Sequence, residues 1–357
     1  MKKLLIVVTF LLSLSCKKSN PNSFVDTNRV YVAGTQQSGT GTLAKYWKNG
    51  QAVILSNGIP YANSTSIAVS GTDVYISGNI SNNNTSSTSL YWKNGQQVVL
   101  ADDNYFSLTN GIQISGNDIY VAASELGQNG MRPCYWKNGQ ISRFKDTSQA
   151  SGPIGLAISE NDLYIAGAIN QNYPVQPNNF LGSYLKNGQS IILEDKDSTD
   201  GESHITGGSN ICVSGTDVYV AGFTINGAMS MPTYWKNGQP TTLVESVHIV
   251  PSNQLLPIVV SGNDIYVAGV VFAPSNNNIA SNGIAMYWKN NQPIYLTDGS
   301  HDAHITGISV LGNDVYVSGY ESNGRHWVAK YWRNGQAVNL SDGSNDEFAN
   351  GIVALPK

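Results

Sequence analysis

The stretch TGISVLGNDVYVSGYESNGRHWVAKYWRNGQAVNL, residues 306–340, holds four short apolar runs separated by turn residues. The runs are rich in β-branched and aromatic residues, which favour strands. They occupy 307–310, 315–318, 330–332 and 337–340. Asn313-Asp314 and Asn334-Gly335 stand between paired runs, and residues of these types favour tight hairpin turns. The stretch therefore predicts two successive hairpins, a unit of four antiparallel strands.

The hexapeptide within this stretch recurs along the chain as YWKNGQ or a close variant. Successive copies begin 44 to 53 residues apart, which is the period of a four-stranded propeller blade. The copies begin at Tyr46, Tyr91, Tyr135, Tyr184, Tyr234, Tyr287 and Tyr331. Three copies differ, with Leu185 in place of Trp, Asn291 in place of Gly and Arg333 in place of Lys. The same four runs surround each copy, so each repeat is predicted to form one blade.

The two ends of the chain are predicted to share a blade. The first repeat starts at Val30 with a strand of the second type, while 350–355 matches the first type and has no blade of its own. Joining the two leaves no unpaired inner edge. We therefore predict an all-β chain in which residues 30–357 form a single seven-bladed β-propeller. Each blade has four antiparallel strands, and the C-terminal strand completes the N-terminal blade.

The recurring phrase Gly-Ile-small-Val, turn, Asp-Val-Tyr-Val-Ala-Gly resembles the β-propeller repeats of many secreted bacterial proteins. The resemblance covers residues 30–355 and implies the fold without implying an activity. The third strand departs from that family by carrying YWKNGQ. The chain also lacks the Ser-x-Asp-x-Gly-x-x-Trp boxes of sialidase-like propellers and the Gly-Gly doublets of Kelch repeats, apart from Gly207-Gly208.

The aromatic pairs of the hexapeptide are predicted to be scaffold. Adjacent strand residues point to opposite faces, and a propeller blade is covered on both faces, so both aromatics can be buried. The tryptophans expected between blades are Trp47, Trp92, Trp136, Trp235, Trp288 and Trp332. Cys134 and Cys212 fall at different strand positions of different repeats. We expect small buried residues there and no disulfide between them.

The first residues indicate a compartment. Lys2 and Lys3 precede an apolar run at 4–14 that is too short to span a bilayer stably, and small residues lead to Cys16. This pattern resembles a bacterial lipoprotein signal peptide, with Ser13 where that family usually has Leu. The resemblance implies a signal peptide over 1–15, lipidation of Cys16 and a flexible tether over 16–29. The protein is then exported and held to the cell envelope by its lipid alone. Plain secretion and a coincidental Cys are the alternatives.

The amino-acid composition indicates which kinds of binding partner to expect. Only 12% of the residues are charged, against about 25% in an average soluble protein. Loss of Lys2 and Lys3 with the signal peptide leaves 18 basic residues against 24 acidic ones, a net charge of about −6. Nucleic acid is therefore not an expected partner. A glycan or an envelope protein suits the uncharged polar surface better.

Binding residues are expected on one face of the disc. The turns inside the hairpins are short and alike, whereas the connections from second to third strand and between blades are long and differ in every repeat. Strand polarity puts the long connections on the same side. One candidate group there comprises Asp298, His301, Asp302 and His304, echoed by Glu202 with His204 and by 342–347. These side chains could ligate a metal or act as an acid–base pair, or they could belong to solvated turns.

Two further groups lie on the same face. Asp195, Asp197 and Asp200 fall in an acidic loop that resembles a Ca²⁺ loop, but its Gly comes one position late, and a solvated acidic loop is the alternative. Arg325, His326 and Trp327 place a cation beside an aromatic, a combination that suits sugar stacking or an anionic group. A Trp packed against its own blade is the alternative there.

No sequence motif identifies a reaction. Phosphate loops, the Gly-x-Ser-x-Gly nucleophile turn and the His-Glu-x-x-His zinc motif are all missing from the sequence. The leading hypothesis is a non-enzymatic binding propeller at the cell envelope, with a glycan or an envelope protein as ligand and no cofactor except the candidate Ca²⁺. The alternatives are a glycosidase or lyase that uses the loop carboxylates and His, and a purely architectural repeat protein.

Overall fold

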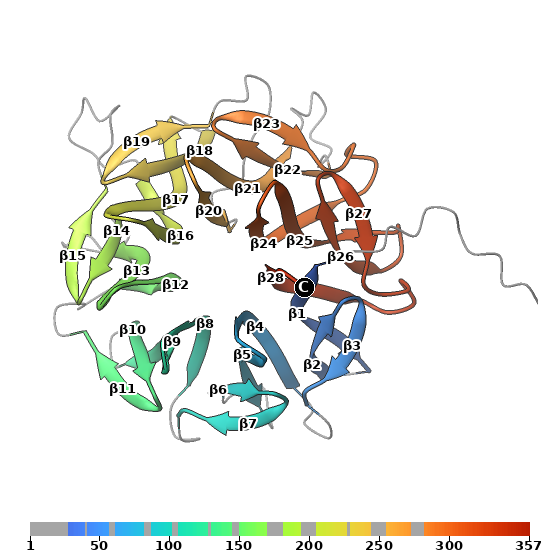
Figure 1. Cartoon of the computed structure of the whole chain (residues 1–357), viewed down its shortest axis with the longest axis horizontal. Helices are drawn as coiled ribbons and strands as arrows, with labels where there is room; N and C mark the ends of the chain where they lie inside the picture. The colour runs from blue at the N-terminus through green and yellow to red at the C-terminus, as the bar shows by residue number, and fades with distance from the viewer. Residues whose placement is uncertain are drawn as a thin grey trace, which may run out of the picture.

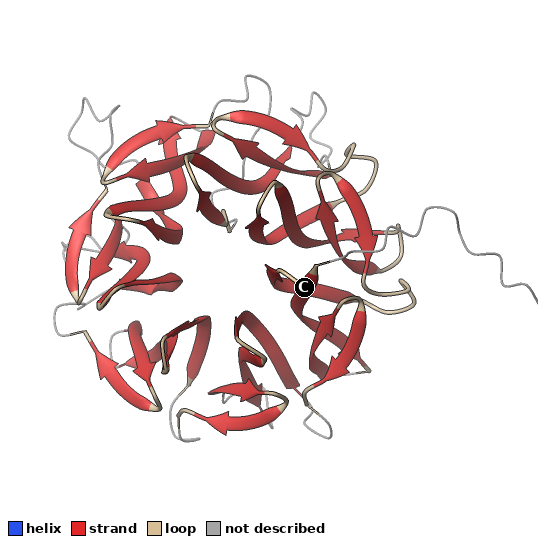
Figure 2. Cartoon of the chain, viewed as in Figure 1, coloured by secondary structure: helices blue, strands red, loops and turns tan. Residues whose placement is uncertain are grey.

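A computed structural model describes residues 28–39, 41–56, 61–81, 87–101, 106–127, 130–144, 150–169, 181–193, 205–226, 229–243, 255–272 and 282–357. These residues form strands and turns and contain no helix (Figure 2). Accordingly, no helix in them is long and apolar enough to cross a bilayer. The sheets radiate from a central opening, which is the arrangement of a β-propeller (Figure 1). The all-β propeller prediction is confirmed. The signal peptide and Cys16 lie outside the described residues.

Four kinds of strand follow one another from the centre to the rim (Figure 1). The inner strands are β4 (Tyr61–Ser70), β8 (Ser107–Ser115), β12 (Ala150–Ser159), β16 (Ile205–Ser214), β20 (Ile258–Ser261), β24 (Ala303–Leu311) and β28 (Glu347–Leu355). The second strands are β1 (Arg29–Ser38), β5 (Asp73–Ser81), β9 (Asp118–Gly127), β13 (Asp162–Ile169), β17 (Asp217–Asn226), β21 (Asp264–Phe272) and β25 (Asp314–Ser322).

The third strands are β2 (Gly41–Lys48), β6 (Thr88–Lys93), β10 (Gly130–Lys137), β14 (Leu181–Lys186), β18 (Met229–Lys236), β22 (Gly283–Lys289) and β26 (Trp327–Arg333). The outer strands are β3 (Gln51–Ile54), β7 (Gln96–Val99), β11 (Gln140–Arg143), β15 (Gln189–Ile192), β19 (Gln239–Thr242), β23 (Gln292–Tyr295) and β27 (Gln336–Asn339).

Hydrogen bonding divides the described strands into five four-stranded sheets and one eight-stranded sheet. In the larger sheet, the single parallel pair Thr42↔Tyr61 joins two four-stranded units, β28-β1-β2-β3 and β4-β5-β6-β7. Every other pairing is antiparallel, as expected for consecutive hairpins. β28 comes from the C-terminus and pairs with β1 from Arg29↔Leu355 to Gln36↔Glu347.

A bulge at a constant place marks five of the inner strands, β4, β8, β16, β24 and β28. The ladder skips one residue there, as in the shift between Ser64 and Ser66. The skipped residues are Thr65, Asn110, Ser209, Thr306 and Asn350. Several of them bond to the next blade: Thr306 Oγ1 donates to Ala349 O at 2.8 Å, and Asn350 Nδ2 donates to Ser64 O at 2.7 Å. The bulge therefore turns four polar side chains into links between blades, those of Thr65, Ser209, Thr306 and Asn350.

The six repeated tryptophans are 0 to 2% exposed, so their prediction as scaffold is confirmed. Five of them pack with tyrosines of the preceding blade; Trp332, for instance, lies in one cluster with Tyr266 and Tyr287. Trp136 instead packs with Leu100 and Ala101, which follow β7. The ring of Trp47 occupies space left by Gly34, where a Cβ would stand 2.1 Å from the indole. Consecutive aromatics thus fill both sides of a blade.

The rest of the hexapeptide stabilises the hairpin turns. In the β8–β11 blade, Asp118 accepts hydrogen bonds from Asn138 Nδ2 at 2.7 Å and from Lys137 Nζ, also at 2.7 Å. Asn138 Oδ1 in turn accepts from the Ile119 amide, and Lys137 lies over the Tyr120 ring. The same Asp–Asn–cation arrangement recurs with Asp73, Asp162, Asp217, Asp264 and Asp314.

One of the two hairpin turns lies where the sequence predicted it, and the other lies one residue earlier in the chain. Asn334 and Gly335 have φ of 49° and 85°, as a tight hairpin turn requires. The turn expected at Asn313-Asp314 instead occupies Gly312 and Asn313, because Gly312 takes the positive φ of 59°. Asp314 therefore begins β25 and is available to bond Asn334 and Arg333.

Candidate functional site

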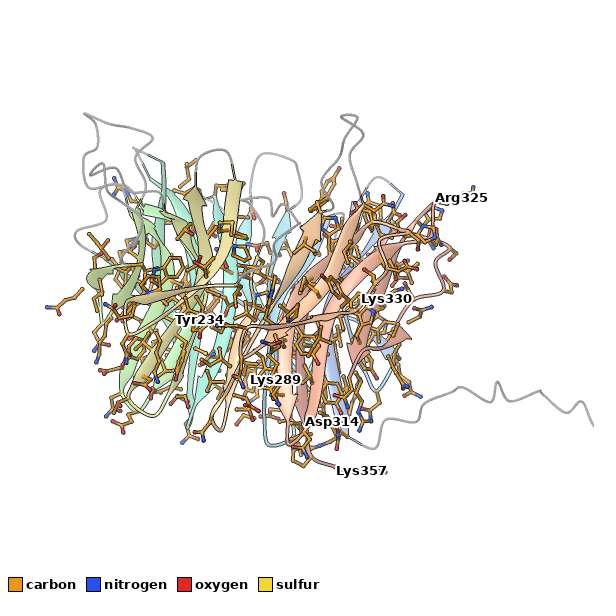
Figure 3. All side chains as sticks on the ribbon, turned by 90° about the horizontal axis from the view of Figure 1, so that it is seen from above. Tyr234, Lys289, Asp314, Arg325, Lys330 and Lys357 are labelled. Carbon is orange, nitrogen blue, oxygen red and sulfur yellow. The ribbon has the colours of Figure 1, made fainter. Side chains whose placement is uncertain are left out.

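The disc has two unlike faces. Asp314 and Lys357 lie at one end of the strands and Arg325 at the other (Figure 3). We call the first the turn face, since it carries the short hairpin turns, and the second the loop face, which carries the connections between second and third strands and between blades. The described part of the loop face is most complete at β24–β28, where both connections of one blade are seen.

The Asp-Gly-Ser segments of the loop face are turns. Asp298 Oδ1 accepts a hydrogen bond from the Ser300 amide at 2.9 Å, and Asp342 Oδ1 accepts one from the Ser344 amide at 2.9 Å. Hydrogen bonds from Ser300 and Ser344 hold the pKa of each aspartate below its usual value. Asp298 therefore fits the turn interpretation of this group.

The second aspartate of each segment clamps a neighbouring strand. Asp302 Oδ1 accepts from the Gly283 amide at 2.7 Å, where β22 begins. Asp346 Oδ1 accepts from the Trp327 amide at 2.8 Å, where β26 begins. Each carboxylate also faces a His: His304 Nε2 lies 3.6 Å from Asp302 Oδ2, and His326 Nδ1 lies 3.2 Å from Asp346 Oδ1.

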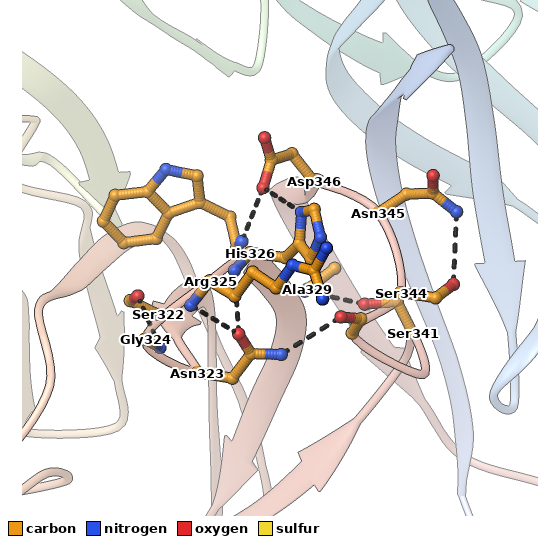
Figure 4. A network of polar contacts seen from close by, with 12 residues as sticks. Ser322, Asn323, Gly324, Arg325, His326, Ala329, Ser341, Ser344, Asn345 and Asp346 are labelled. Atoms are coloured by element: carbon orange, nitrogen blue, oxygen red, sulfur yellow. Dashed lines mark hydrogen bonds and ion pairs between the residues drawn. The ribbon is translucent and has the colours of Figure 1, made fainter. Parts of the chain in front are cut away.

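The connection that carries Arg325 is ordered by hydrogen bonds (Figure 4). Asn323 Oδ1 accepts from the amides of Arg325 and His326 at 2.9 and 2.8 Å. Asn323 Nδ2 donates to Gly343 O at 3.1 Å, which ties this connection to the next one. The exposed Arg325 therefore projects from a backbone that is already fixed, a favourable condition for binding.

Beside this connection lies a cluster of four half-buried rings, His304, Tyr320, Trp327 and Phe348, which we call the loop-face aromatic cluster. His304 stacks on Tyr320 with ring centroids 4.9 Å apart. Trp327 meets Tyr320 and His304 edge-on at 5.2 Å, and Phe348 meets Tyr320 at 5.0 Å. Burial, with a smaller contribution from Asp302, raises the pKa of Tyr320. The cluster is apolar in character and keeps part of its surface in solvent.

The structure brings together part of the predicted site. Asp302, His304 and Trp327 meet in or beside the cluster, and His326 lies on its ordered connection, whereas His301 is exposed and Asp298 is used in its turn. Trp327 does pack against its own blade, as the alternative interpretation held. Glu202, His204, Asp195, Asp197 and Asp200 lie outside the described residues. Within the described ranges, no three His, Cys, Asp or Glu side chains gather as a metal site requires.

Tyr320 and Phe348 belong to this site without having been predicted, and Asp346 was named only as part of the 342–347 segment that echoes the first candidate group. For Asp346 the signal was present, since Asp-Gly-Ser-Asn-Asp at 342–346 repeats Asp-Gly-Ser-His-Asp at 298–302. Tyr320 and Phe348 occupy ordinary strand positions. Only the packing of β28 against β25 shows that they meet.

A hollow lies on the axis of the disc, apart from the aromatic cluster. It has a volume of about 350 Å³ and is lined by the inner strands of every sheet. Its polar wall includes Asn110, Asn210 and Asn350, and no charged residue lines it. Cys212 also faces it, so this thiol is half-buried, whereas Cys134 is fully buried. Both cysteines are free, as expected.

Comparison with known proteins supports the fold. No protein-family model and no curated protein sequence matches the chain. Among solved structures, the β-propeller domain of the Trilobed protease from Pyrococcus furiosus is 10% identical with a TM-score of 0.55, over 90% of this chain and 96% of that one. TolB from Acinetobacter baumannii is 13% identical with a TM-score of 0.47, over 92% and 83%. The likeness to the first of these shows a shared β-propeller fold and nothing further.

Proposed function

We propose that this protein is an exported lipoprotein whose seven-bladed propeller binds a glycan at the cell envelope through the loop-face aromatic cluster, without catalysing a reaction. The N-terminal pattern ending in Cys16 supports export and anchoring. In the proposed ring, the C-terminal strand completes the N-terminal blade.

Contacts between the chain ends support a closed ring. The β28–β1 ladder runs over eight residue pairs. Asn350 Nδ2 reaches both Thr35 Oγ1 at 3.0 Å and Ser64 O at 2.7 Å, so it links β28 to its own blade and to the next one. At the turn face, Asn28 Nδ2 donates to Tyr316 Oη at 2.8 Å. These bonds join residues that are about 290 to 320 apart in the chain.

The observation that carries the binding proposal is the aromatic cluster itself. Sugars present apolar C–H faces and a hydroxyl rim, and partly exposed aromatic rings with polar neighbours match both. Trp327 and His304 supply ring surface, and the exposed Arg325 stands on the adjoining ordered connection. The comparable positions in the β4–β7 blade hold Ser87 in place of Trp327 and Asn79 in place of Tyr320, so the cluster is not a blade-packing requirement.

The His–Asp pairs support binding better than catalysis. In Asp302 and Asp346, one carboxylate oxygen accepts a hydrogen bond from the first amide of a strand, at 2.7 and 2.8 Å. Both carboxylates therefore already hold the backbone in place. A general acid or base needs a proton-transfer position beside the substrate. The pairs therefore position the loops around the cluster.

A glycan array with the mature protein tests the proposal. We expect binding to at least one polysaccharide class, lost in Trp327→Ala and kept in Tyr295→Ala, which removes an exposed aromatic of β23 at the rim. A blank array together with capture of one envelope protein by pull-down would replace the glycan with a protein ligand. Cleavage of a polysaccharide that disappears in His304→Ala and in Asp298→Ala would replace binding with catalysis.

A further inference from the structure

A crevice of about 140 Å³ lies where the β8–β11 blade meets the residues that follow β7. The β8–β11 blade is well away along the ring from β24–β28, whose residues form the aromatic cluster (Figure 1). Its charged groups are the carboxylate of Glu125 and the guanidinium of Arg143, Ser107 also lines it, and its walls include Trp136, Leu100 and Ile141. Glu125 and Trp136 are buried, at 8% and 2% exposure. The volume is far above what one water requires. A buried carboxylate beside an indole ring, in an open crevice, needs an explanation.

Two other blades show what these groups hold. In the β24–β27 blade, Lys330 Nζ lies 2.5 Å from Glu321 Oε2 and over the Trp332 ring, 5.9 Å from its centroid. In the β28–β3 blade, Lys45 Nζ lies 2.6 Å from Glu347 Oε2 and 4.9 Å from the centroid of Trp47. In both blades a primary ammonium is held between a carboxylate and the face of the hexapeptide Trp.

The strand registers place the β8–β11 residues at the same positions as those of β24–β27. Glu125 pairs with Ser107 and Arg132 as Glu321 pairs with Ala303 and Val328. Trp136 pairs with Val121 as Trp332 pairs with Val317. Glu125 and Trp136 are thus the counterparts of the two groups that hold an ammonium in β24–β27.

The lysine is missing from this blade. Cys134 occupies its position, opposite Ala123 as Lys330 is opposite Gly319. Other blades that lack the lysine also lack the carboxylate. In the β4–β7 blade, Leu90 stands at the lysine position and Ile80 at the carboxylate position. In the β16–β19 blade, Thr233 and Thr224 stand there, with their hydroxyls 3.1 Å apart. The β8–β11 blade keeps the carboxylate without an internal ammonium, and a crevice lies beside it.

Arg143 covers the carboxylate from outside. Its Nε lies 2.7 Å from Glu125 Oε2, but its side chain is 57% exposed and comes from the outer strand β11. Because the guanidinium side of this pair lies largely in solvent, water and salt screen it more than they screen the buried pairs of Lys45 and Lys330. Arg143 is therefore a displaceable cover, unlike the buried Lys45 and Lys330.

We propose that this crevice, which we call the ammonium crevice, binds a primary alkylammonium group from outside the chain, such as a lysine side chain of a partner protein. The ammonium takes the place that Lys330 Nζ fills in its own blade, bonded to Glu125 and lying against Trp136, while Leu100 and Ile141 contact the alkyl stem. This inference does not depend on glycan binding by the loop-face aromatic cluster.

The test uses n-butylammonium, which has the four-carbon stem of lysine, and n-butanol as its uncharged counterpart. Binding to the ¹⁵N-labelled mature protein is followed by NMR through the indole N–H of Trp136. We expect saturable shifts with n-butylammonium and none with n-butanol. Glu125→Gln should weaken binding by about tenfold or more, because it removes a charge-assisted hydrogen bond. Arg143→Ala should strengthen binding several-fold, and Glu160→Gln, which alters a carboxylate on a turn-face hairpin, should leave it unchanged.

Cys134→Lys provides an internal replacement and should abolish binding by filling the crevice with the chain's own ammonium. Should this variant fail to fold, Glu125→Gln and Arg143→Ala carry the test. Three results would overturn the proposal: no saturable shift in either the wild type or Arg143→Ala, equal binding of n-butanol, or unchanged binding in Glu125→Gln. If n-butylammonium binds but a lysine-containing peptide does not, the crevice takes small amines and the partner-protein source is wrong.

Discussion

Lys45 and Glu347, 302 residues apart in the chain, form an ion pair of 2.6 Å that joins β2 to β28. Only 5% and 10% of their side-chain surfaces are exposed. Removing one member of a buried pair leaves a buried charge without its partner, which costs about 3 to 5 kcal/mol. We predict that Glu347→Gln lowers the free energy of unfolding by about 3 kcal/mol, measured by urea denaturation.

Asp73→Asn is the matched control for this change. It breaks the Lys93–Asp73 pair, whose side chains are 43% and 36% exposed, and should alter stability little. An effect of Glu347→Gln no larger than that of Asp73→Asn would mean that the pair does not stabilise the junction of the chain ends.

Gly34 makes room for Trp47, so an added methyl group should be poorly tolerated. A Cβ at Gly34 would lie 2.1 Å from the indole Cζ3 and 2.5 Å from Phe348 O. Overpacking of this kind typically costs about 1 to 3 kcal/mol. We expect Gly34→Ala to lower the melting temperature clearly. Gly351→Ala, where the nearest heavy atom is 3.7 Å away, should not do so; equal effects of the two would contradict this account of the blade interior.

The turn-face aspartates make the free energy of unfolding depend on pH in the acid range. Hydrogen bonds from Lys137 and Asn138 lower the pKa of Asp118, and the five counterparts are lowered by the same kinds of donor. The pKa of each of these aspartates is lower in the folded protein than in the unfolded chain, where it is about 3.9. The ionised aspartates therefore stabilise the fold fully above about pH 3.9, and this stabilisation is lost as the pH falls through their lower folded pKa. Urea midpoints should therefore be steady from pH 7 to 5 and fall below pH 4. Asp118→Asn should show a shallower fall; an identical one would rule out its contribution.

Both described cysteines should be unreactive in the folded protein. Burial raises the pKa of the Cys134 and Cys212 thiols to about 12, so very little thiolate exists at pH 8. In a Cys16→Ser variant, a thiol reagent at pH 8 should label neither residue until urea is added, and then both. Rapid labelling of the native protein would show that a thiol is more accessible than the structure indicates.

Local signals made the scaffold predictable. The spacing of the hexapeptides and the Asn334-Gly335 turn depend on neighbouring residues, and the burial of Trp332 follows from a repeat that places every blade between two others. The bulges escaped prediction because Thr306 and Asn350 look like ordinary strand residues until the ladder skips them.

The site was less predictable because it depends on contacts between separate strands and connections, which the local sequence of each does not show. Trp327 was predicted as a candidate together with Arg325 and His326, but Tyr320, which it contacts, and Phe348, which contacts Tyr320, come from β25 and β28. The clamp from Asp346 to the Trp327 amide likewise forms only when two connections fold together. Asp298 shows the converse, since its local sequence already indicated the turn that the structure contains.

Glycan binding through the loop-face aromatic cluster is the central claim, and one titration tests it most directly. A polysaccharide found on the array would be titrated by calorimetry into the wild type, Trp327→Ala and Tyr295→Ala, with folding of each checked by circular dichroism. We predict equal affinity for the wild type and Tyr295→Ala and a loss of about tenfold or more in Trp327→Ala, since a buried aromatic anchor typically contributes about 2 kcal/mol or more and tenfold corresponds to about 1.4 kcal/mol. Unchanged affinity in a folded Trp327→Ala variant would contradict the claim.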